Sequence, residues 1–228
     1  MLKNYLKIAW RNLQRHKAFS LINIGGLSIG IAACLLISLY VNYETSYDDY
    51  NVKKGRIVRI TNLIRTPESD NVNIAQTPTL LATTLNHNYP EVETAVRFEP
   101  DQPVIKVNNQ LFKEDNIYKT DANVFDVFTY PFIEGNPKQA LSDPHNIVIT
   151  ASLAKKYFGN ASAMGKSIMC NNVPYTVSGV LADLPENSDL KINALLPGDF
   201  WKEKDWTSFD FSVYTYVLFK QKPDVTNF

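Results

Sequence analysis

Residues 159–167, GNASAMGKS, have the residue types of a phosphate-binding loop, with two glycines followed by lysine and serine. A Walker A loop places four residues between its glycines, so that successive backbone N–H groups surround one phosphate. Five residues separate Gly159 from Gly165, which redirects those N–H groups. Residues 151–158 favour a helix, whereas a Walker A loop follows a strand. We therefore expect a glycine-bounded connection between a helix and a strand.

Two further motifs have the residue types of acyl transfer. Ser152 and Lys155 form S-x-x-K, and residues 69–71 form S-D-N, as in penicillin-binding enzymes. The nucleophile motif should come first and no K-T-G follows, so this chemistry is not favoured. The three histidines and two cysteines are not clustered along the sequence, and a metal site is not indicated. We expect no catalytic, cofactor-binding or metal-ligating residue.

Charged residues are unevenly distributed along the chain. All 23 acidic residues lie at or beyond Glu44, whereas five of the 23 basic residues lie within residues 1–17. Residues 18–43 contain no charged side chain. As a helix they would extend about 39 Å, more than the roughly 30 Å hydrocarbon core of a bilayer requires. We predict a transmembrane helix over residues 18–43.

A cleaved signal peptide is the alternative for this apolar stretch. Its apolar region would be only about 7–15 residues long and would end at an A-x-A-like site, which LISLYVNYE lacks. Basic residues precede the span and Glu44 follows it, so the positive-inside rule places the N-terminus in the cytoplasm. Residues 44–228 are then expected on the other side of the membrane, where ATP is scarce.

Residues 1–17 predict a basic amphipathic helix, because apolar side chains recur at three- and four-residue steps and basic ones occupy the other face. Such a helix would lie in the cytoplasmic interface, with Trp10 at headgroup depth and Arg11, Arg15 and Lys17 against anionic lipid. A simpler alternative is that these charges only set the topology. The further interpretation is a coupling element next to a cytoplasmic partner.

Gly26 and Gly30 form G-x-x-x-G within the predicted span. Small residues one turn apart let another helix approach closely. We expect packing against other transmembrane helices, with a plain lipid-facing helix as the alternative.

Residues 44–228 predict a mixed α+β domain. Residues 55–65 and 92–98 are strand-like on either side of a helix-like segment, 78–88, which indicates a β-α-β unit. Two hairpins are expected at the pairs Asn108-Asn109 and Asn171-Asn172, because asparagine tolerates positive φ. Further expected elements are a short aromatic helix at 122–128, strands at 147–150 and 213–220, and a helix at 151–158.

The chain resembles permeases of the MacB/FtsX-like group of ABC transporters, in a style typical of Bacteroidetes. The resemblance begins with KIAWRNLQRHKAFSLINIGGLSIGIAACLLI. It continues through ANVFDVFTYPFIEGNPKQAL, NIVITASLAKKYFGNASAMGKSI and YTVSGVLADLPENSDLKINALL, which are similar to the MacB-like periplasmic core domain. The order of these motifs is more specific than any one of them.

The resemblance implies a permease with its large periplasmic domain between the first and second of four transmembrane helices. It implies a two-lobed domain, with a porter-like β-α-β lobe over about 50–100 and 188–228 and an inserted lobe over about 101–187. No closing span follows PDVTNF, so we expect a fragment that is incomplete at its C-terminus.

The resemblance also implies the partners. The permease would act as a homodimer or pseudo-dimer in the bacterial inner membrane, with a separate cytoplasmic ATPase that holds ATP and Mg. Further implied partners are a periplasmic adaptor, an outer-membrane duct and membrane lipid. It would relay ATP-driven motion to the periplasm to export a drug, peptide or lipoprotein, although some relatives activate cell-wall hydrolases. Our own hypothesis is that residues 47–51 carry this motion into the external lobes. We expect no enzyme activity and no nucleic-acid partner.

The rival hypothesis is a single-span receptor with an extracytoplasmic sensing domain. It accounts for one helix and one external domain, but not for the glycine-rich packing face or the basic interfacial helix.

Overall fold

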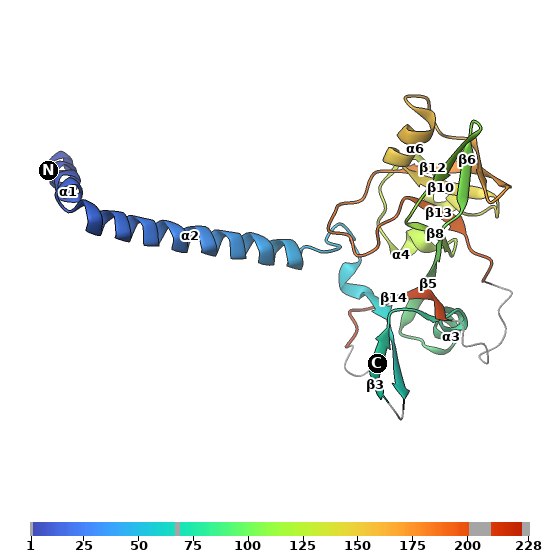
Figure 1. Cartoon of the computed structure of the whole chain (residues 1–228). Coiled ribbons are helices and arrows are strands. Elements are labelled where there is room, and N and C mark those ends of the chain that lie inside the picture. The colour runs from blue at the N-terminus through green and yellow to red at the C-terminus, as the bar shows by residue number, and fades with distance from the viewer. Residues whose placement is uncertain (1, 67–68, 201–210, 225–228) are drawn as a thin grey trace. The chain divides into compact units, whose positions relative to one another are not determined.

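A computed structural model gives the structure of the chain and describes residues 2–66, 69–200 and 211–224. Contacts divide the chain into two units, Met1–Tyr47 and Asp48–Phe228. The first unit consists of two helices, and the second, which we call the sheet domain, combines a large sheet with short helices (Figure 1).

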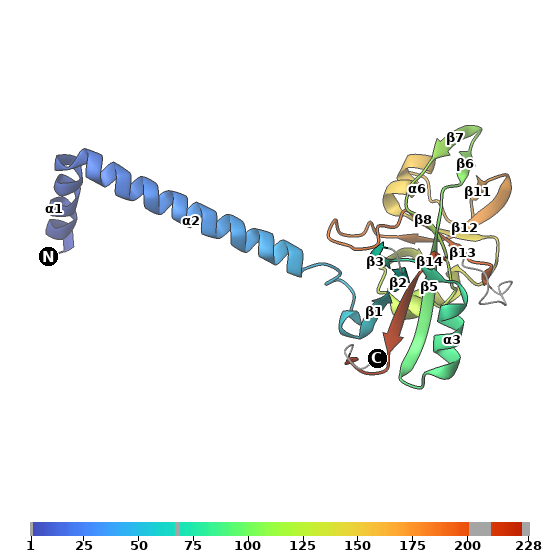
Figure 2. The ribbon, with the colours of Figure 1, turned by 60° about the horizontal axis from the view of Figure 1, so that its bottom comes forward.

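Helices α1 (Leu2–Arg15) and α2 (Lys17–Thr45) meet at a bend at His16, whose backbone leaves the helical region at φ −115° (Figure 2). They correspond to the predicted helices over 1–17 and 18–43. The 29 residues of α2 extend about 44 Å. None of them is buried, and α2 is the one helix in the described part of the chain that is long and apolar enough to cross a membrane.

The sheet domain contains one sheet of 12 strands among the described residues. The strands of its main path follow the order β1 (Ile57–Ile60), β14 (Phe211–Phe219), β5 (Val92–Asp101), β8 (Ile117–Thr120), β13 (Ala194–Pro197), β10 (Asn146–Thr150), β12 (Val173–Leu181), β11 (Ser167–Cys170), β6 (Val104–Val107) and β7 (Gln110–Lys113). β4 (Thr77–Pro78) pairs with β14, and β9 (Phe132–Gly135) pairs with β12. A separate ribbon pairs β2 (Asn62–Thr66) with β3 (Ser69–Ile74).

The predicted β-α-β unit is present in a split form. β1 and β5 are both antiparallel to β14, so they run parallel to each other with β14 between them. Helix α3 (Leu80–Asn88) lies between these strands in sequence and packs on β5. The predicted strand over 55–65 is divided, because β1 ends at Ile60 and β2 starts a separate ribbon.

A second parallel pair joins β10 to β12, with helix α6 (Ala151–Phe158) in the connection. Thr150 ends β10 and caps α6, since its side chain accepts a hydrogen bond from the Leu153 N–H. The predicted helix over 151–158 is therefore confirmed with the same bounds.

Both predicted asparagine hairpins are confirmed. Asn108 and Asn109 join β6 to β7 with φ of 50° and 64°, and Asn171 and Asn172 join β11 to β12 with φ of 48° and 66°. Positive φ at both central residues defines the type of turn whose twist matches that of the flanking strands.

Alternating side chains divide the core between the two faces of the sheet. On β10, Ile147 and Ile149 pack in a cluster that includes Leu153 of α6, whereas Val148 belongs to the cluster on the other face. Helices α4 (Val124–Val127) and α5 (Pro137–Ala140) contribute to that second cluster. A third, smaller cluster joins α3 to β5 and β14.

The predicted division into two lobes stays a prediction. The described sheet runs without a break across the boundary expected near residue 100, because β8 pairs with β5 on one side and with β13 on the other. β13 in turn pairs with β10.

Candidate functional site

The first residues of the sheet domain, 48–56, form what we call the junction segment, which directly follows the helical unit along the chain. Asp48 adopts a left-handed conformation with φ 57°, and its carbonyl accepts a hydrogen bond from the Asn51 N–H at 2.9 Å. The Asp48 N–H donates to the Asn187 carbonyl at 3.1 Å. These contacts turn the chain and attach it to the loop that precedes β13.

The carboxylate of Asp48 continues this attachment. Its Oδ1 atom accepts from the Asp189 N–H at 3.1 Å and from the Ser188 hydroxyl at 3.3 Å. Burial raises the pKa of Asp48, and the neighbouring Asp189 carboxylate raises it further, while the Asp189 N–H and the Ser188 hydroxyl act in the opposite direction. The contact therefore includes a carboxylate that is partly removed from water.

Tyr50 connects the junction segment to the aromatic core. Its hydroxyl lies 2.8 Å from the Ser188 hydroxyl, and its ring stacks on Tyr130 with centroids 6.5 Å apart. Tyr130 in turn stacks on Phe128 at 5.5 Å. Burial raises the pKa of both tyrosines, so their rings pack as neutral groups.

Asn51 and the two residues after it bind α4 and the connection from α4 to β9. Asn51 is only 2% exposed, and its Oδ1 accepts from the Thr129 N–H at 2.9 Å. The Val52 N–H donates to the Thr129 hydroxyl at 3.2 Å, and the Lys53 ammonium donates to the Asp126 carbonyl at 2.5 Å. The segment is thus bound to two connections that are far apart in sequence.

The far end of the segment is bound to the start of β5 and the end of β14. The Arg56 guanidinium donates to Glu93 at 2.7 Å and to the carbonyls of Phe219 and Lys220 at 2.9 and 3.1 Å. Short helix η1 (Lys54–Arg56) then leads into β1. A displacement of the junction segment would therefore reach the loop before β13, the start of β9 and the end of β14.

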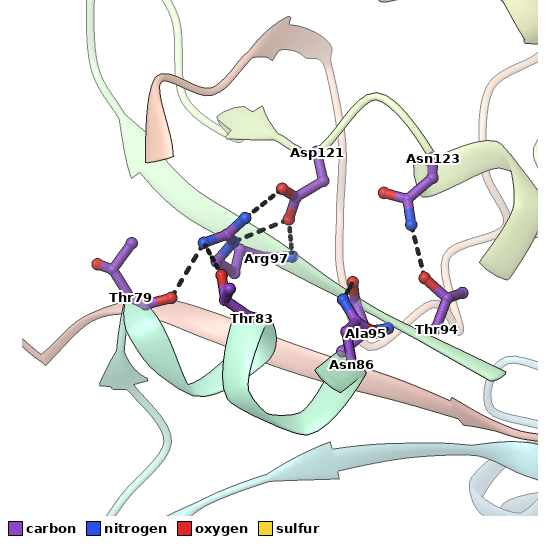
Figure 3. A network of polar contacts seen from close by, with 8 residues as sticks. All are labelled: Thr79, Thr83, Asn86, Thr94, Ala95, Arg97, Asp121 and Asn123. Atoms are coloured by element: carbon purple, nitrogen blue, oxygen red, sulfur yellow. Dashed lines mark hydrogen bonds and ion pairs between the residues drawn. The ribbon is translucent and has the colours of Figure 1, made fainter. Parts of the chain in front are cut away.

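A second polar network holds α3 against the sheet (Figure 3). The Arg97 guanidinium makes two hydrogen bonds to the carboxylate of Asp121, at 2.5 and 2.9 Å, and also donates to the Thr79 carbonyl at 3.1 Å. The side chain of Asn86 in α3 accepts from the Ala95 N–H at 2.7 Å. α3 and the residue after β8 are thereby fixed to β5.

A sequence model of the MacB-like periplasmic core domain matches residues 20–227, which include most of α2 and nearly all of the sheet domain. The chain belongs to this family. MacB-like periplasmic core domains are non-catalytic parts of ABC transporter permeases, which in general act with a cytoplasmic ATPase and as dimers. The family and the apolar helix α2 together identify a membrane protein.

Three solved structures share the MacB-like fold. A domain of a protein described as a permease, from Porphyromonas gingivalis, is 22% identical and has a TM-score of 0.66. The alignment covers 78% of this chain and 78% of that domain. The periplasmic region of MacB from Actinobacillus actinomycetemcomitans is 17% identical, with 77% of this chain and 82% of that chain covered and a TM-score of 0.55. The extracellular domain of YknZ, a noncanonical ABC-type transporter of Gram-positive bacteria, is 19% identical and has a TM-score of 0.54. The alignment covers 75% of this chain and 87% of the YknZ chain. No curated protein sequence matches the chain.

In this MacB-like domain, residues 159–167 form the expected connection between a helix and a strand. Gly159 ends α6 with φ 63°, and Gly165 has φ 73° and donates its N–H to the Val177 carbonyl at 2.8 Å. The Lys166 ammonium lies 4.5 Å from the centre of the Phe158 ring. The loop is therefore held by contacts within the domain.

Ser152, the serine of the S-x-x-K motif, also has a structural partner. The Ser152 hydroxyl donates to Asp183 at 2.7 Å, and the Ser152 N–H donates to the same carboxylate at 3.0 Å. The side chains of residues 69–71 lie outside the described part of the chain. No group of three or more potential metal ligands occurs among the residues that the structure describes.

The predicted membrane-interface residues lie in the helical unit. Trp10, Arg11 and Arg15 are exposed on α1, and Lys17 begins α2. Gly26 and Gly30 lie one turn apart on α2, and an added Cβ atom at either would meet no atom within 4 Å. Their roles in lipid contact and helix packing stay predictions.

The binding partners of the junction segment could not be predicted from the sequence. The sequence predicts that residues 47–51, which overlap the segment, carry motion, but it does not predict their partners, because Thr129 and Ser188 lie about 80 and 140 residues later. No local pattern marks either residue, because each takes part through a hydrogen bond that only the folded chain forms.

Proposed function

We propose that the chain is a permease subunit of a MacB-like ABC transporter that relays motion from a cytoplasmic ATPase to its periplasmic domain. The observation that carries this proposal is the junction segment, which follows a 29-residue apolar helix and is bound to three separate parts of the domain. A loosely attached ectodomain would not require such contacts.

The proposed orientation places α1 in the cytoplasm and the sheet domain in the periplasm. The positive charge of α1 and the complete absence of acidic residues before Glu44 support it. ATP and Mg would then bind to a separate ATPase, consistent with the structural role of residues 159–167. The chain would itself carry out no chemistry.

The relay would act on a substrate in the periplasm, such as a drug, peptide or lipoprotein. Gly26 and Gly30 would pack α2 against other helices of a permease dimer or pseudo-dimer. Asn51 and Tyr50 would make the junction stiff, since Asn51 is buried and hydrogen-bonded and Tyr50 stacks within the core.

The test begins with purification of the affinity-tagged chain from its native membrane and identification of any ABC ATPase that accompanies it. The complex is then spin-labelled at residue 52, because Val52 is 84% exposed. A Val52→Cys, Cys34→Ala variant restricts labelling to this site, since burial raises the pKa of the Cys170 thiol to about 12.

We expect the distance between labels in two copies to differ between ATP-bound and nucleotide-free complexes. The matched control carries the label at residue 52 with an ATPase that cannot bind ATP, and its distance should stay constant. If no ATPase accompanies the chain and the distance is independent of nucleotide, the relay is wrong and the single-span receptor becomes the better hypothesis.

A further inference from the structure

A groove of about 530 Å³ lies between α1 and α2, on the inner side of their bend. Its lining is largely apolar, and Trp10 beside it is 66% exposed. The residues that line it are Trp10, Leu13 and Gln14 from α1, and Lys17, Ser20, Leu21, Ile24 and Gly25 from α2.

The groove is flanked by uncompensated positive charge. Lys17 is part of its lining, and Lys7 and Lys3 lie three and seven residues before Trp10, which places them next to Trp10 where the basic face of α1 borders the apolar face. No acidic residue occurs in either helix before Glu44, so no carboxylate of these helices neutralises them. An occupant of this groove must be apolar in its body and anionic at its head.

We propose that the groove binds one anionic phospholipid, with an acyl chain along Trp10, Leu21 and Ile24 and the headgroup phosphate against Lys7 and Lys17. Basic pockets beside membrane helices on the cytoplasmic side are suited to such headgroups. This inference rests on the membrane placement proposed above.

A neighbouring helix is a less suitable occupant, because the predicted packing residues lie elsewhere on α2. Gly25 lines the groove, whereas Gly26 points about 100° away from it around the helix axis. Gly30 is one turn after Gly26 and lies on the same side of α2 as Gly26. Bulky Leu21 and Ile24 line the groove instead. A flexible acyl chain can follow such a surface, whereas close helix packing needs small residues.

Quenching of tryptophan fluorescence by brominated lipid tests the site directly. Trp201→Phe and Trp206→Phe leave Trp10 as the single tryptophan. The chain is reconstituted in phosphatidylcholine vesicles that contain a small fraction of phosphatidylglycerol with brominated acyl chains, or of phosphatidylcholine with the same chains. We compare the mole fractions of the two brominated lipids that give half-maximal quenching. For each lysine that contacts the headgroup, we expect this mole fraction to be about fivefold lower for phosphatidylglycerol than for phosphatidylcholine.

Variants separate the site from general charge and from general lipid contact. Lys7→Gln with Lys17→Gln should bring the two quenching curves together. Arg15 is about 140° around α1 from Trp10, so its predicted lipid contact lies outside the groove, and Arg15→Gln should leave the curves apart. Gly25→Leu fills the groove and should abolish quenching by the brominated chains. Gly25→Ala should keep it, because an added Cβ meets no atom within 4 Å.

Equal quenching by the two lipids, or an equal effect of Arg15→Gln, would overturn the proposal in favour of a plain lipid-facing surface. Absence of quenching by either lipid would overturn it in favour of a groove covered by protein. The measurement needs neither ATPase nor nucleotide, so failure of the lipid site and failure of the relay are distinguishable.

Discussion

The Oδ1 atom of Asn51 accepts a hydrogen bond from the backbone N–H of Thr129, 78 residues later in the chain, at 2.9 Å. Leucine has a similar size but no acceptor, so Asn51→Leu would leave this N–H without a partner. We expect the variant to lower the free energy of unfolding by about 1–3 kcal/mol. Urea unfolding followed by circular dichroism measures this, with the exposed Asn160→Leu as the control that should change little. Equal effects of the two variants would contradict a role for the hydrogen bond.

Asp48 predicts an unusual dependence of stability on pH. Its pKa is raised in the folded state, chiefly by burial, so between pH 3.8 and the raised value the folded chain holds more protons than the unfolded one. The contribution of Asp48 to stability therefore falls as pH rises through this window. Asp48→Asn keeps an acceptor and removes the charge, so we expect it to be more stable than the wild type at pH 7, with the difference vanishing near pH 3.8 and below. Unfolding curves at a series of pH values measure the difference, and a constant difference would show that the carboxylate is not desolvated.

Gly135 has φ 100°, and a Cβ atom there would lie 2.6 Å from the Ser178 carbonyl oxygen. The Ser178 oxygen is a backbone atom of β12, which pairs with β9 at this position, so it cannot move aside as the end of a flexible side chain could. We expect Gly135→Ala to lower the free energy of unfolding by about 1–3 kcal/mol from the backbone conformation alone, with the clash adding to it. Thermal unfolding provides the measurement. Gly55→Ala is the matched control, because its Cβ would meet no atom within 4 Å, and a similar loss there would refute this explanation.

The ion pair of Arg97 and Asp121 is largely buried, with side chains 11% and 18% exposed. Removing one partner leaves the other charge buried, so we expect Asp121→Ala to cost about 3 kcal/mol or more. Lys119→Ala removes a more exposed ion pair with Asp101 and should cost at most about 1 kcal/mol. Urea unfolding compares the two, and the prediction fails if Lys119→Ala is the more costly change.

Local chemistry made several elements predictable from the sequence. The asparagine pairs predict both hairpins because asparagine tolerates positive φ, and the same positions have φ of 48° to 66° in the structure. Residues 18–43 predict a span because length and apolar composition alone decide it. The helix over 151–158 is likewise bounded by a local cap at Thr150 and by Gly159.

The missed features depend on contacts between distant segments. Nothing in residues 213–220 indicates that they pair between β1 and β5, because a strand pattern shows which face is apolar and not which neighbours it has. The same limitation applies to Asp48, whose partners Ser188 and Asp189 lie about 140 residues away. The candidate site could therefore be located by its place after the span, but its contacts could not.

The position of β14 between β1 and β5 also determines the order in which the chain can fold. A ribosome completes β1 by residue 60 and β5 by residue 101, but the strand that joins them comes only with residues 211–219. Until then both strands keep an unpaired edge, which is a template for pairing with other chains. Non-local pairing of this kind is slow to form. A newly made chain thus has an extended period in which protection by a chaperone would determine how much of it reaches the folded state.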